Sequence, residues 1–486
     1  MSLFPHRPSA ATAWLLGLLT LLHLLVIGRF GLSGDEAHYA LYGLYPDWSY
    51  FDHPPLIGWL QALVLLFSES NFALRLWPVL LSLFSSLLLY RLTRALYPEA
   101  SPWLGFIAVV LLQTALIFQL LSMAMLPDTP LLPLSLAAVW LSYRIIEQGR
   151  EQEWLLLGLV LGLAGLAKYT AVLLVPSILL MIALTGRWRT LMTPWPWLGA
   201  LLAVLLILPV FYWNWQHEWI SFAYQMGHGM PDRDWEASRF VLSLAGQLLA
   251  YGPLLFLLAP LALLSQWRQW REPGLRYAWV FGVPVLLFFA WSSGLNRVLP
   301  HWTLVGWVML IPLLADGLYR LWHRRHVRIA TWIGVGYALV LGLILHGEFF
   351  HPWLPFADNR HPLADLHGWE LAIQQARQHR DMMGEEPGPT PVLFSGNWSY
   401  TSHIAWRARP DTVRTLGRSG DQHEIWFGSA QVGDRGILIV PRPLRRNVDN
   451  WLARFTHCSL AETVSYPIRG RPATEYQLFA CEDYRG

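Results

Sequence analysis

Long apolar segments alternate with short polar loops over most of this chain. A helix needs about 20 residues to cross the hydrocarbon of a bilayer, and the apolar segments therefore predict about eleven transmembrane helices. The two segments that flank Lys168 are short for this purpose. No small-residue cleavage site follows the first segment, so we interpret it as an uncleaved helix and not as a signal peptide. The segments are 13–27, 75–92, 103–121, 129–146, 154–167, 169–186, 195–214, 240–264, 277–293, 302–319 and 329–347.

Arginines gather in every second predicted loop. Since cytoplasmic loops are enriched in basic residues, this pattern places the amino terminus inside and residues 350–486 outside. We therefore expect a multi-pass membrane protein with an extracytoplasmic carboxyl-terminal part. The loop arginines on the inner side are Arg91, Arg94, Arg144, Arg150, Arg187, Arg189, Arg268, Arg271 and Arg276, and the segment 320–328.

The pattern changes after residue 349. Residues 370–383 show the spacing of an amphipathic helix, and the stretches VLFSGNW and GILIVPRP read as strands. We therefore predict a membrane domain at 1–349 and a small extracytoplasmic α/β domain at 350–486. Within the first outer loop, YALYGLY and LIGWLQALVLLF predict short juxtamembrane helices at the interface, where tyrosine and tryptophan are favoured.

The composition agrees with a membrane protein. Hydrophobic residues make up 54% of the chain and charged residues only 14%, against about 25% charged in soluble proteins. The formal charge is +3, and nothing in the pattern indicates nucleic-acid binding. The two cysteines, Cys458 and Cys481, lie in the predicted outer domain. A disulfide between them is one interpretation there, and two buried free thiols are the other.

The first outer loop, residues 34–55, is dense in titratable side chains. These are Asp35, Glu36, His38, Asp47, Asp52 and His53. Four motifs follow in order along the chain: GDEAHY with YFDHPPLIGWL in this loop, MLPDTPLL at 125–132, GLAKYTAVLLVP at 165–176 and NRVLPHWTLVGW at 296–307.

Together these motifs resemble the bacterial polyprenyl-phosphate-sugar glycosyltransferases of the GT-C fold, a family 39-like group related to the protein O-mannosyltransferases and the lipid A aminoarabinose transferase. The resemblance covers roughly the first 310 residues. It implies a polyprenyl (undecaprenyl) phosphate sugar as donor and a hydroxyl of a lipid, glycan or protein as acceptor. It also implies inverting transfer on the periplasmic face.

The resemblance assigns the catalytic base to the first acid of the pair Asp35–Glu36, and places a second acid, Asp128, near it. Such transfer needs a carboxylate that takes the acceptor proton. Glu36 would orient Asp35 or the acceptor, or bind a divalent cation. Solvated loop charges are the alternative for the pair, and a helix N-cap is the alternative for Asp128.

Four basic side chains are candidates for the donor phosphate: Arg297, Lys168, His53 and His301. Arginine offers a planar donor fork that matches phosphate oxygens. Lys168 either holds the phosphate or snorkels to the interface. His53 stands where the aminoarabinose branch has lysine, which weakens the case for aminoarabinose as the sugar. The metal question stays open, with Glu36, Asp52 and His53 as candidate ligands for a divalent cation.

Two other classes of function fit parts of the pattern. A transporter or flippase of lipid-linked sugars would bind the same substrate without bond cleavage, but such proteins show internal repeats and midplane charges, which this chain lacks. A scaffold that presents the outer domain would leave the acidic first loop unexplained. The segment 215–239 either orders over the donor, with HGMPDRD as a lid, or only connects two helices.

Overall fold

The computed structural model describes residues 7–229, 233–354, 356, 361, 363–417, 420–442 and 448–486. Its contacts divide the chain into two compact units. The first comprises residues 1–27, 47–57 and 75–346, and the second comprises 28–46, 58–74 and 347–486. The division predicted at 349/350 therefore differs in that two amino-terminal segments pack with the carboxyl-terminal part.

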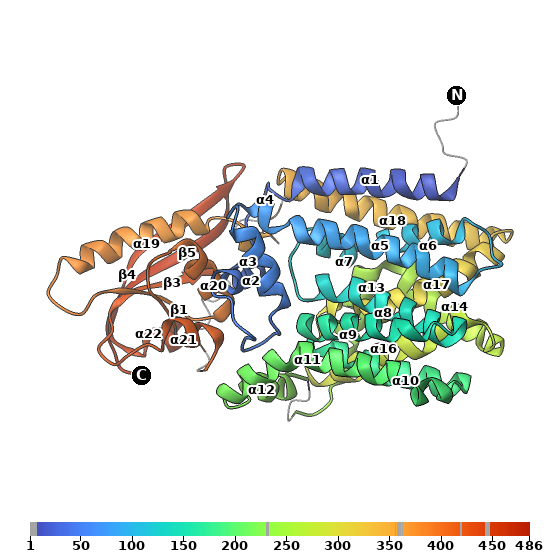
Figure 1. Ribbon diagram of the computed structural model, residues 1–486. Coiled ribbons are helices and arrows are strands. Elements are labelled where there is room, and N and C mark those ends of the chain that lie inside the picture. Colours follow the sequence, from blue (N-terminus) through green and yellow to red (C-terminus); the bar gives the residue numbers. More distant parts are fainter. Residues whose placement is uncertain are drawn as a thin grey trace. The chain divides into compact units, whose positions relative to one another are not determined.

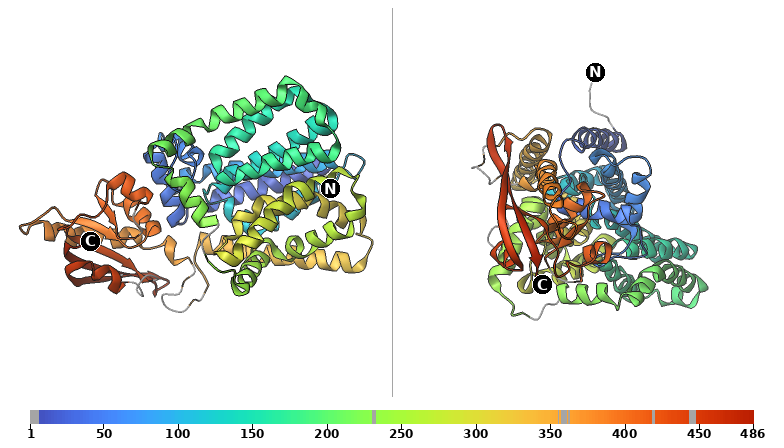
Figure 2. Two further views of the ribbon diagram at one scale, coloured as in Figure 1. Left: turned by 90° about the horizontal axis from the view of Figure 1, so that it is seen from below. Right: turned by 90° about the vertical axis from the view of Figure 1, so that its left-hand side faces the viewer.

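The first unit is a helical bundle, whose long helices run roughly parallel to one another (Figures 1 and 2). The described residues contain eight helical segments that are long and apolar enough to cross a membrane. These are α1 (Pro8–Val26), α4 with α5 (Asn71–Leu96), α8 (Asp128–Gln148), α11 (Pro194–Gln216), α13 with α14 (Ala237–Ser265), α15 with α16 (Pro273–Leu295), η7 with α17 (Pro300–Arg320) and α18 (Arg325–Phe350).

The other three predicted spans are helical but short or interrupted. Residues 103–121 form α6 (Leu104–Gln113) and α7 (Leu116–Leu121), which are separated by a break. Around Lys168 lie α9 (Trp154–Ala167), the 3-10 turn η2 (Tyr169–Leu173) and α10 (Leu174–Thr185). With 14 residues, α9 rises only about 21 Å, less than the hydrocarbon thickness. Eight of the eleven expected crossings are thus matched by full-length helices, and the total of eleven stays a prediction.

The centre of the bundle is built from α8 and α17 (Leu304–Arg320), the two most buried of these spans. Their apolar side chains pack with α5 (Leu76–Leu96), α6 and α9 in one continuous core. By contrast, α1, α11 and α18 leave most of their apolar surface uncovered by protein. A helix that is apolar all round and little buried suits contact with lipid.

The second unit contains a five-stranded sheet in the order β2-β1-β3-β5-β4. The strands are β1 (Val392–Ser395), β2 (Val413–Thr415), β3 (Gly436–Pro441), β4 (Phe455–Ile468) and β5 (Arg471–Tyr484). β1 pairs in parallel with β2 and β3, and β5 runs antiparallel between β3 and β4. This mixed sheet confirms the predicted α/β domain, and the two stretches read as strands are β1 and β3.

Helices cover both faces of this sheet. On one face, α19 (Trp369–Gly384) and α20 (Trp398–Arg407) pack on Leu393 and Ile437, and Figure 1 shows α19 lying along the sheet. The other face carries Phe394 and Leu438 and is covered by α22 (Val448–Leu452). The alternation follows from the two-residue repeat of a strand. The predicted helix at 370–383 is confirmed as α19.

Three amino-terminal helices complete the second unit. They are α2 (Gly34–Leu44), α3 (Leu56–Leu65) and α4 (Asn71–Leu74), so the two predicted juxtamembrane segments are helical. Ala37, Ala40 and Leu41 of α2 are fully buried in the same apolar cluster as α19 and α20. The helix that begins beside Asp35 is therefore part of the core of this unit.

Cys458 of β4 and Cys481 of β5 are paired partners in the antiparallel ladder, and they form a disulfide. The interpretation as two free thiols is therefore wrong.

Candidate active site

A buried ion pair joins the second predicted acid to the single lysine of the chain. The Lys168 Nζ donates to both carboxylate oxygens of Asp128, at 2.8 and 2.7 Å. Both side chains are almost fully buried, with 9% and 5% exposed. Lys168 therefore does not snorkel to the interface. Asp128 begins α8 but makes no cap hydrogen bond, so the N-cap interpretation is wrong as well.

The local fold explains how Lys168 reaches this position. α9 ends at Ala167, and Lys168 itself is extended, with φ −159° and ψ 140°. The chain then resumes helical geometry in η2. This break turns the side chain out of the helical repeat and toward the start of α8. Lys168 also lies 6.0 Å from the ring centroid of Trp302, the outer limit of a cation–π contact.

His301 adds a second basic group to this pair. Its Nε2 lies 3.7 Å from Oδ2 of Asp128. The short turn η7 (Pro300–Thr303) that carries His301 is fixed from α13 (Ala237–Pro253), because the Tyr251 hydroxyl donates to the Pro300 carbonyl at 2.7 Å. Gly252 follows with φ +71°, a left-handed conformation that favours glycine, and it kinks the helix at this point.

His53 belongs to the same electrostatic group. The Asp128 carboxylate interacts most strongly with Lys168, then with His301, and also with His53. His53 lies 4.0 Å from the carboxylate of Asp52. Lys168 and His301 thus lie close to Asp128, and the assignment of Lys168, His301 and His53 to the donor phosphate stays a prediction.

The loop of Asp52 and His53 is held from α12 (Ile220–Gly229). Ser221 Oγ donates to the Tyr50 carbonyl at 2.9 Å, and Gln225 Nε2 donates to the Asp52 carbonyl at 2.6 Å. These residues belong to the predicted long outer loop, which is therefore largely helical. Residues 230–232 of the proposed lid lie outside the described part of the chain.

In the described part of the chain, the Arg297 side chain makes no hydrogen bond or ion pair with this group. It follows α16 (Val283–Leu295) and is exposed. Within the described residues its guanidinium has neither an ion-pair nor a hydrogen-bond partner, so its charge is uncommitted. In contrast, Lys168 is neutralised by Asp128.

A long apolar groove runs along α9, η2, α10, α11 and α12, with a cavity volume of about 760 Å³. Small residues of α9 and α11 open it, among them Gly165 and Ala203. Tyr169 and Gln225 supply polar groups to the lining of the groove. The Tyr169 ring lies 5.5 Å from the ring of Phe222, which is on the same helix as Gln225, so the two polar residues lie near one end of the groove. This end adjoins Lys168 through the chain and Asp52 through the Gln225 hydrogen bond.

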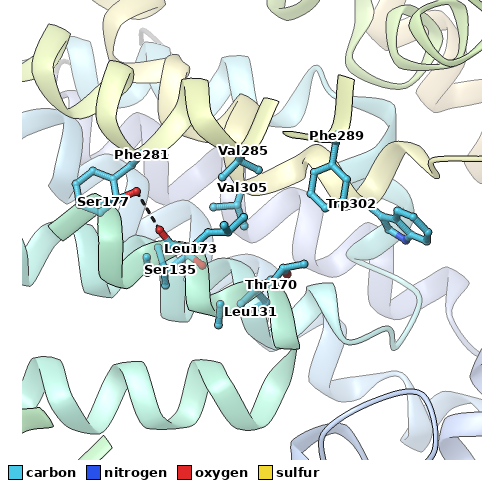
Figure 3. Close-up of a pocket in the computed structure, with 12 residues that line it drawn as sticks. Leu131, Ser135, Thr170, Leu173, Ser177, Phe281, Val285, Phe289, Trp302 and Val305 are labelled. Carbon is cyan, nitrogen blue, oxygen red and sulfur yellow. Dashed lines mark hydrogen bonds between the residues drawn. The ribbon is translucent and has the colours of Figure 1, made fainter. Parts of the chain in front are cut away.

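A second cavity lies among α8, η2, α10, α16 and η7 (Figure 3). Its volume is about 20 Å³, enough for a water molecule but not for a sugar. Ser135 and Thr170 line it, and Trp302 closes one side. The Ser135 hydroxyl is buried without a hydrogen-bond partner in the described residues. This cavity is therefore not a substrate pocket of the size that a glycosyl donor needs.

Asp35 and Glu36 lie in the second unit, in the first turn of α2. Glu36 closes a capping box: its Oε2 accepts from the Ser33 amide at 3.0 Å, and the Ser33 hydroxyl accepts from the Glu36 amide at 3.3 Å. Both groups stabilise the start of the helix. The roles predicted for Glu36, orientation of Asp35 or of the acceptor, stay predictions. Asp35 is partly buried beside it.

No group of three or more His, Cys, Asp or Glu side chains in the described part of the chain is arranged to hold a metal ion. Of the candidate ligands, Asp52 and His53 are neighbours, while the Glu36 carboxylate is engaged in the capping box. A metal role for Glu36, Asp52 and His53 stays a prediction.

Several supporting residues were not predicted from sequence. The pattern Ser33-x-x-Glu36 is a recognisable capping-box signature and could have been found. Tyr251, Ser221 and Gln225 act through hydrogen bonds to backbone carbonyls far away in the chain. No local pattern marks such contacts.

Comparison with known proteins supports this fold. The family model for dolichyl-phosphate-mannose-protein mannosyltransferases matches residues 52–213, a segment that includes His53, Asp128 and Lys168. The whole chain superposes on the crystal structure of ArnT from Cupriavidus metallidurans bound to undecaprenyl phosphate. The TM-score is 0.64 at 14% identity, covering 96% of this chain and 98% of ArnT.

This chain has the GT-C glycosyltransferase fold. The predicted class, a polytopic helical membrane protein with a small α/β domain, is confirmed. The GT-C chain is also 24% identical over 303 residues to the lipid A galacturonosyltransferase RgtD of Rhizobium johnstonii, which is 60% of this chain and 61% of RgtD. It is 28% identical over 338 residues to the undecaprenyl phosphate-alpha-4-amino-4-deoxy-L-arabinose arabinosyl transferase of Edwardsiella ictaluri, covering 65% and 58%. The alignments thus span less than two thirds of either relative.

Proposed function

We propose that the protein is a membrane glycosyltransferase that moves a sugar from a polyprenyl-phosphate donor to an acceptor hydroxyl. One observation carries this proposal: an apolar groove of about 760 Å³ is lined by Tyr169, the residue that follows Lys168 of the buried Lys168–Asp128 pair. A long apolar tail with a charged head requires this combination of surfaces. The arabinosyl transferase of Edwardsiella ictaluri carries undecaprenyl phosphate in its name, and the ArnT structure holds undecaprenyl phosphate; both favour the same donor class.

The donor phosphate needs a cation whose charge is not already neutralised. Lys168 is paired with Asp128 through both carboxylate oxygens, so we assign it to positioning the head group with its remaining N–H. Arg297 carries an uncommitted guanidinium, whose planar fork suits phosphate oxygens. His53 and His301 supply further donors at the edge of the group. Arg297 is therefore the main phosphate ligand in this proposal.

Asp35 is the proposed base. In a single displacement, the acceptor oxygen forms a bond to the anomeric carbon while the bond from that carbon to the phosphate oxygen breaks. The acceptor proton passes to the Asp35 carboxylate, and polyprenyl phosphate leaves with the electron pair. This step inverts the anomeric centre. The Glu36 capping box fixes the turn that carries Asp35.

We further propose that the reaction takes place on the periplasmic face of a bacterial inner membrane. The disulfide between Cys458 and Cys481 supports an oxidising compartment for the second unit. The arginine distribution among the loops supports the same orientation. A transporter of lipid-linked sugars is less favoured, since the relatives are named as transferases.

The test is a transfer assay in proteoliposomes that contain lipid A. The donors are labelled undecaprenyl phosphates carrying 4-amino-4-deoxy-L-arabinose, galacturonate or mannose. We expect the native protein to consume one of them and to release undecaprenyl phosphate. Asp35→Asn should reduce the rate at least 10³-fold while the thermal unfolding midpoint stays within about 2 °C, because the substitution is isosteric.

Glu69→Gln is the matched control, since it removes an exposed acid of the same unit that pairs with Arg409. It should leave transfer unchanged. Undiminished transfer by Asp35→Asn would refute the assignment of the base. If no donor is consumed but one crosses the bilayer, the protein is a transporter instead.

A further inference from the structure

The first turn of α2 is tied to a carboxylate from the far end of the chain. The Gly34 amide donates to Oδ2 of Asp365 at 3.2 Å, across 331 positions of sequence. The first amides of a helix have no partner within the helix, and an anion at this end is also favoured by the helix dipole. Asp365 therefore completes the capping of the turn that contains Asp35.

A chain of hydrogen bonds through the buried His403 holds Asp365 in place. His403 Nε2 lies 3.2 Å from Oδ1 of Asp365, and the His403 side chain is fully buried. Arg407 Nη1 donates to His403 Nδ1 at 3.1 Å, and Arg407 Nε donates to Glu370 at 3.0 Å. Since a guanidinium only donates, Nδ1 must accept, and the ring proton must lie on Nε2, facing Asp365. The hydrogen bond from Arg407 thus sets the tautomer of His403.

Electrostatics keep both ends of this contact in the required forms. Burial acts to raise the pKa of the Asp365 carboxyl, but the His403 hydrogen bond, the Gly34 amide and Arg407 hold that pKa below its usual range. Burial lowers the pKa of His403 against the effect of Asp365. At neutral pH, an ionised Asp365 thus faces a neutral imidazole.

A second contact lies one turn further along α2. His38 Nδ1 is 3.2 Å from the Ser402 hydroxyl, which is 3.0 Å from His423 Nε2. His38 follows Asp35 by three positions and thus lies on the same side of the helix. In addition, a Cβ at Gly34 would overlap the Ser399 hydroxyl and lie 3.2 Å from the Ser399 carbonyl oxygen. α2 and α20 are therefore in contact at backbone distance.

We propose that Asp365, oriented by His403 and Arg407, is a positioning residue that fixes the Asp35 turn for proton transfer from the acceptor. The second unit then contributes to the reaction by fixing the position of the base, Asp35. This inference rests on the proposed function, because it takes Asp35 as the base.

The experiment compares Asp365→Asn and Asp365→Glu with native protein in the proteoliposome assay, using the donor that the native protein consumes. The asparagine cannot satisfy both Gly34 and His403 as acceptor. We expect kcat to fall 10- to 100-fold with KM for the donor changed less than 3-fold, and glutamate to restore part of the loss. Hydrogen exchange at residues 34–38 should rise in Asp365→Asn in step with the loss of rate.

Asp411→Asn is the matched control, because Asp411 is a partly buried acid of the same unit that also accepts from basic side chains, those of Arg377 and Arg380. It should leave both kcat and α2 exchange as in the native protein. Native kcat in Asp365→Asn overturns the inference, and so does a loss of rate without faster exchange in α2. If the native protein consumes no donor, the proposed function fails. Unchanged hydrogen exchange at residues 34–38 in Asp365→Asn would separately refute the claim that Asp365 fixes the first turn of α2.

Discussion

Lys168 donates to both oxygens of Asp128, 40 positions earlier in the chain, in the interior of the helical unit. Removing one partner of a buried ion pair leaves an unpaired charge and costs about 3–5 kcal/mol. We therefore expect Lys168→Met to lower the thermal unfolding midpoint strongly in detergent. The double variant Lys168→Met, Asp128→Leu should recover most of that loss, while transfer stays absent in both. A double variant no more stable than the single one would contradict this account of the pair.

Substitutions of Arg297 should weaken donor binding and leave the stability of the protein unchanged. The Arg297 side chain is exposed and has no ion-pair partner among the described residues, so substitutions there should change unfolding by less than about 0.5 kcal/mol. Arg297→Gln should nevertheless raise KM for the donor at least 10-fold, and Arg297→Lys should raise it less. The control is Arg271→Gln, an exposed arginine of a predicted inner loop, which should leave KM unchanged. Equal KM values in both glutamine variants would remove Arg297 from the phosphate site.

The groove can be tested by filling it. Val204 lines the groove from α11, whereas Leu201 of the same helix is exposed and does not line it. We expect Val204→Trp to raise KM for the undecaprenyl donor about 10-fold and to leave a donor with a short prenyl chain unaffected. Leu201→Trp adds the same indole elsewhere and should change neither. Kinetics with the two donors, measured for both variants, decide the matter.

Asp421 predicts a pH dependence in the second unit. Its Oδ1 caps α21 (Gln422–Phe427) by accepting from the amides of His423 and Glu424. Burial, aided by the charge of Glu424, raises the pKa of this carboxyl from 3.8 to about 6. The folded state thus binds the proton more tightly, so this group stabilises the fold fully below about pH 4, and the contribution is lost as pH rises through 6.

Asp421→Asn keeps an N-cap acceptor without the buried charge. We expect it to flatten the dependence of the unfolding midpoint on pH between about 4 and 7 and to raise that midpoint at pH 7.5. Asp421→Ala should instead lose about 1 kcal/mol at every pH. The same pH slope in native protein and Asp421→Asn would show that another group titrates.

The disulfide tests the orientation of the second unit. With this unit in the periplasm, Cys458 and Cys481 of protein in native membranes should resist a maleimide reagent until a reductant is added, and then both should react. Exchange of both cysteines for alanine should lower stability by about 2–4 kcal/mol. Reaction without a reductant would place the unit in a reducing compartment.

The sequence reveals the membrane helices because each is an uninterrupted apolar run, and lipid selects for composition. It also indicates Asp128, Lys168, His53 and His301, since charged groups beside membrane helices are rare and stand out. Their pairing could not be predicted. Which cation meets Asp128 depends on the break at Lys168 and on the kink at Gly252, and both are results of tertiary packing.

The residues that hold the Asp35 turn were also beyond prediction from sequence. Asp365, His403 and Arg407 lie in loops and helices of ordinary composition, and no spacing links them to Gly34. Their importance arises only when α20 is laid against α2. The boundary predicted at 349/350 missed the amino-terminal segments for the same reason. The apolar face of α2 suggests contact with the membrane as long as its partner, α20, is not known.

The second unit is assembled from three separated stretches of chain, with residues 28–46 and 58–74 closed by residues 347–486. A ribosome that has completed every membrane helix has therefore still not made the partners of α2. Ala37, Ala40 and Leu41 of that helix therefore lack their packing partners until the helical bundle has been synthesised. A chain without residues 347–486 therefore lacks the partners that pack on the Asp35 turn, and the folding of this turn depends on that segment.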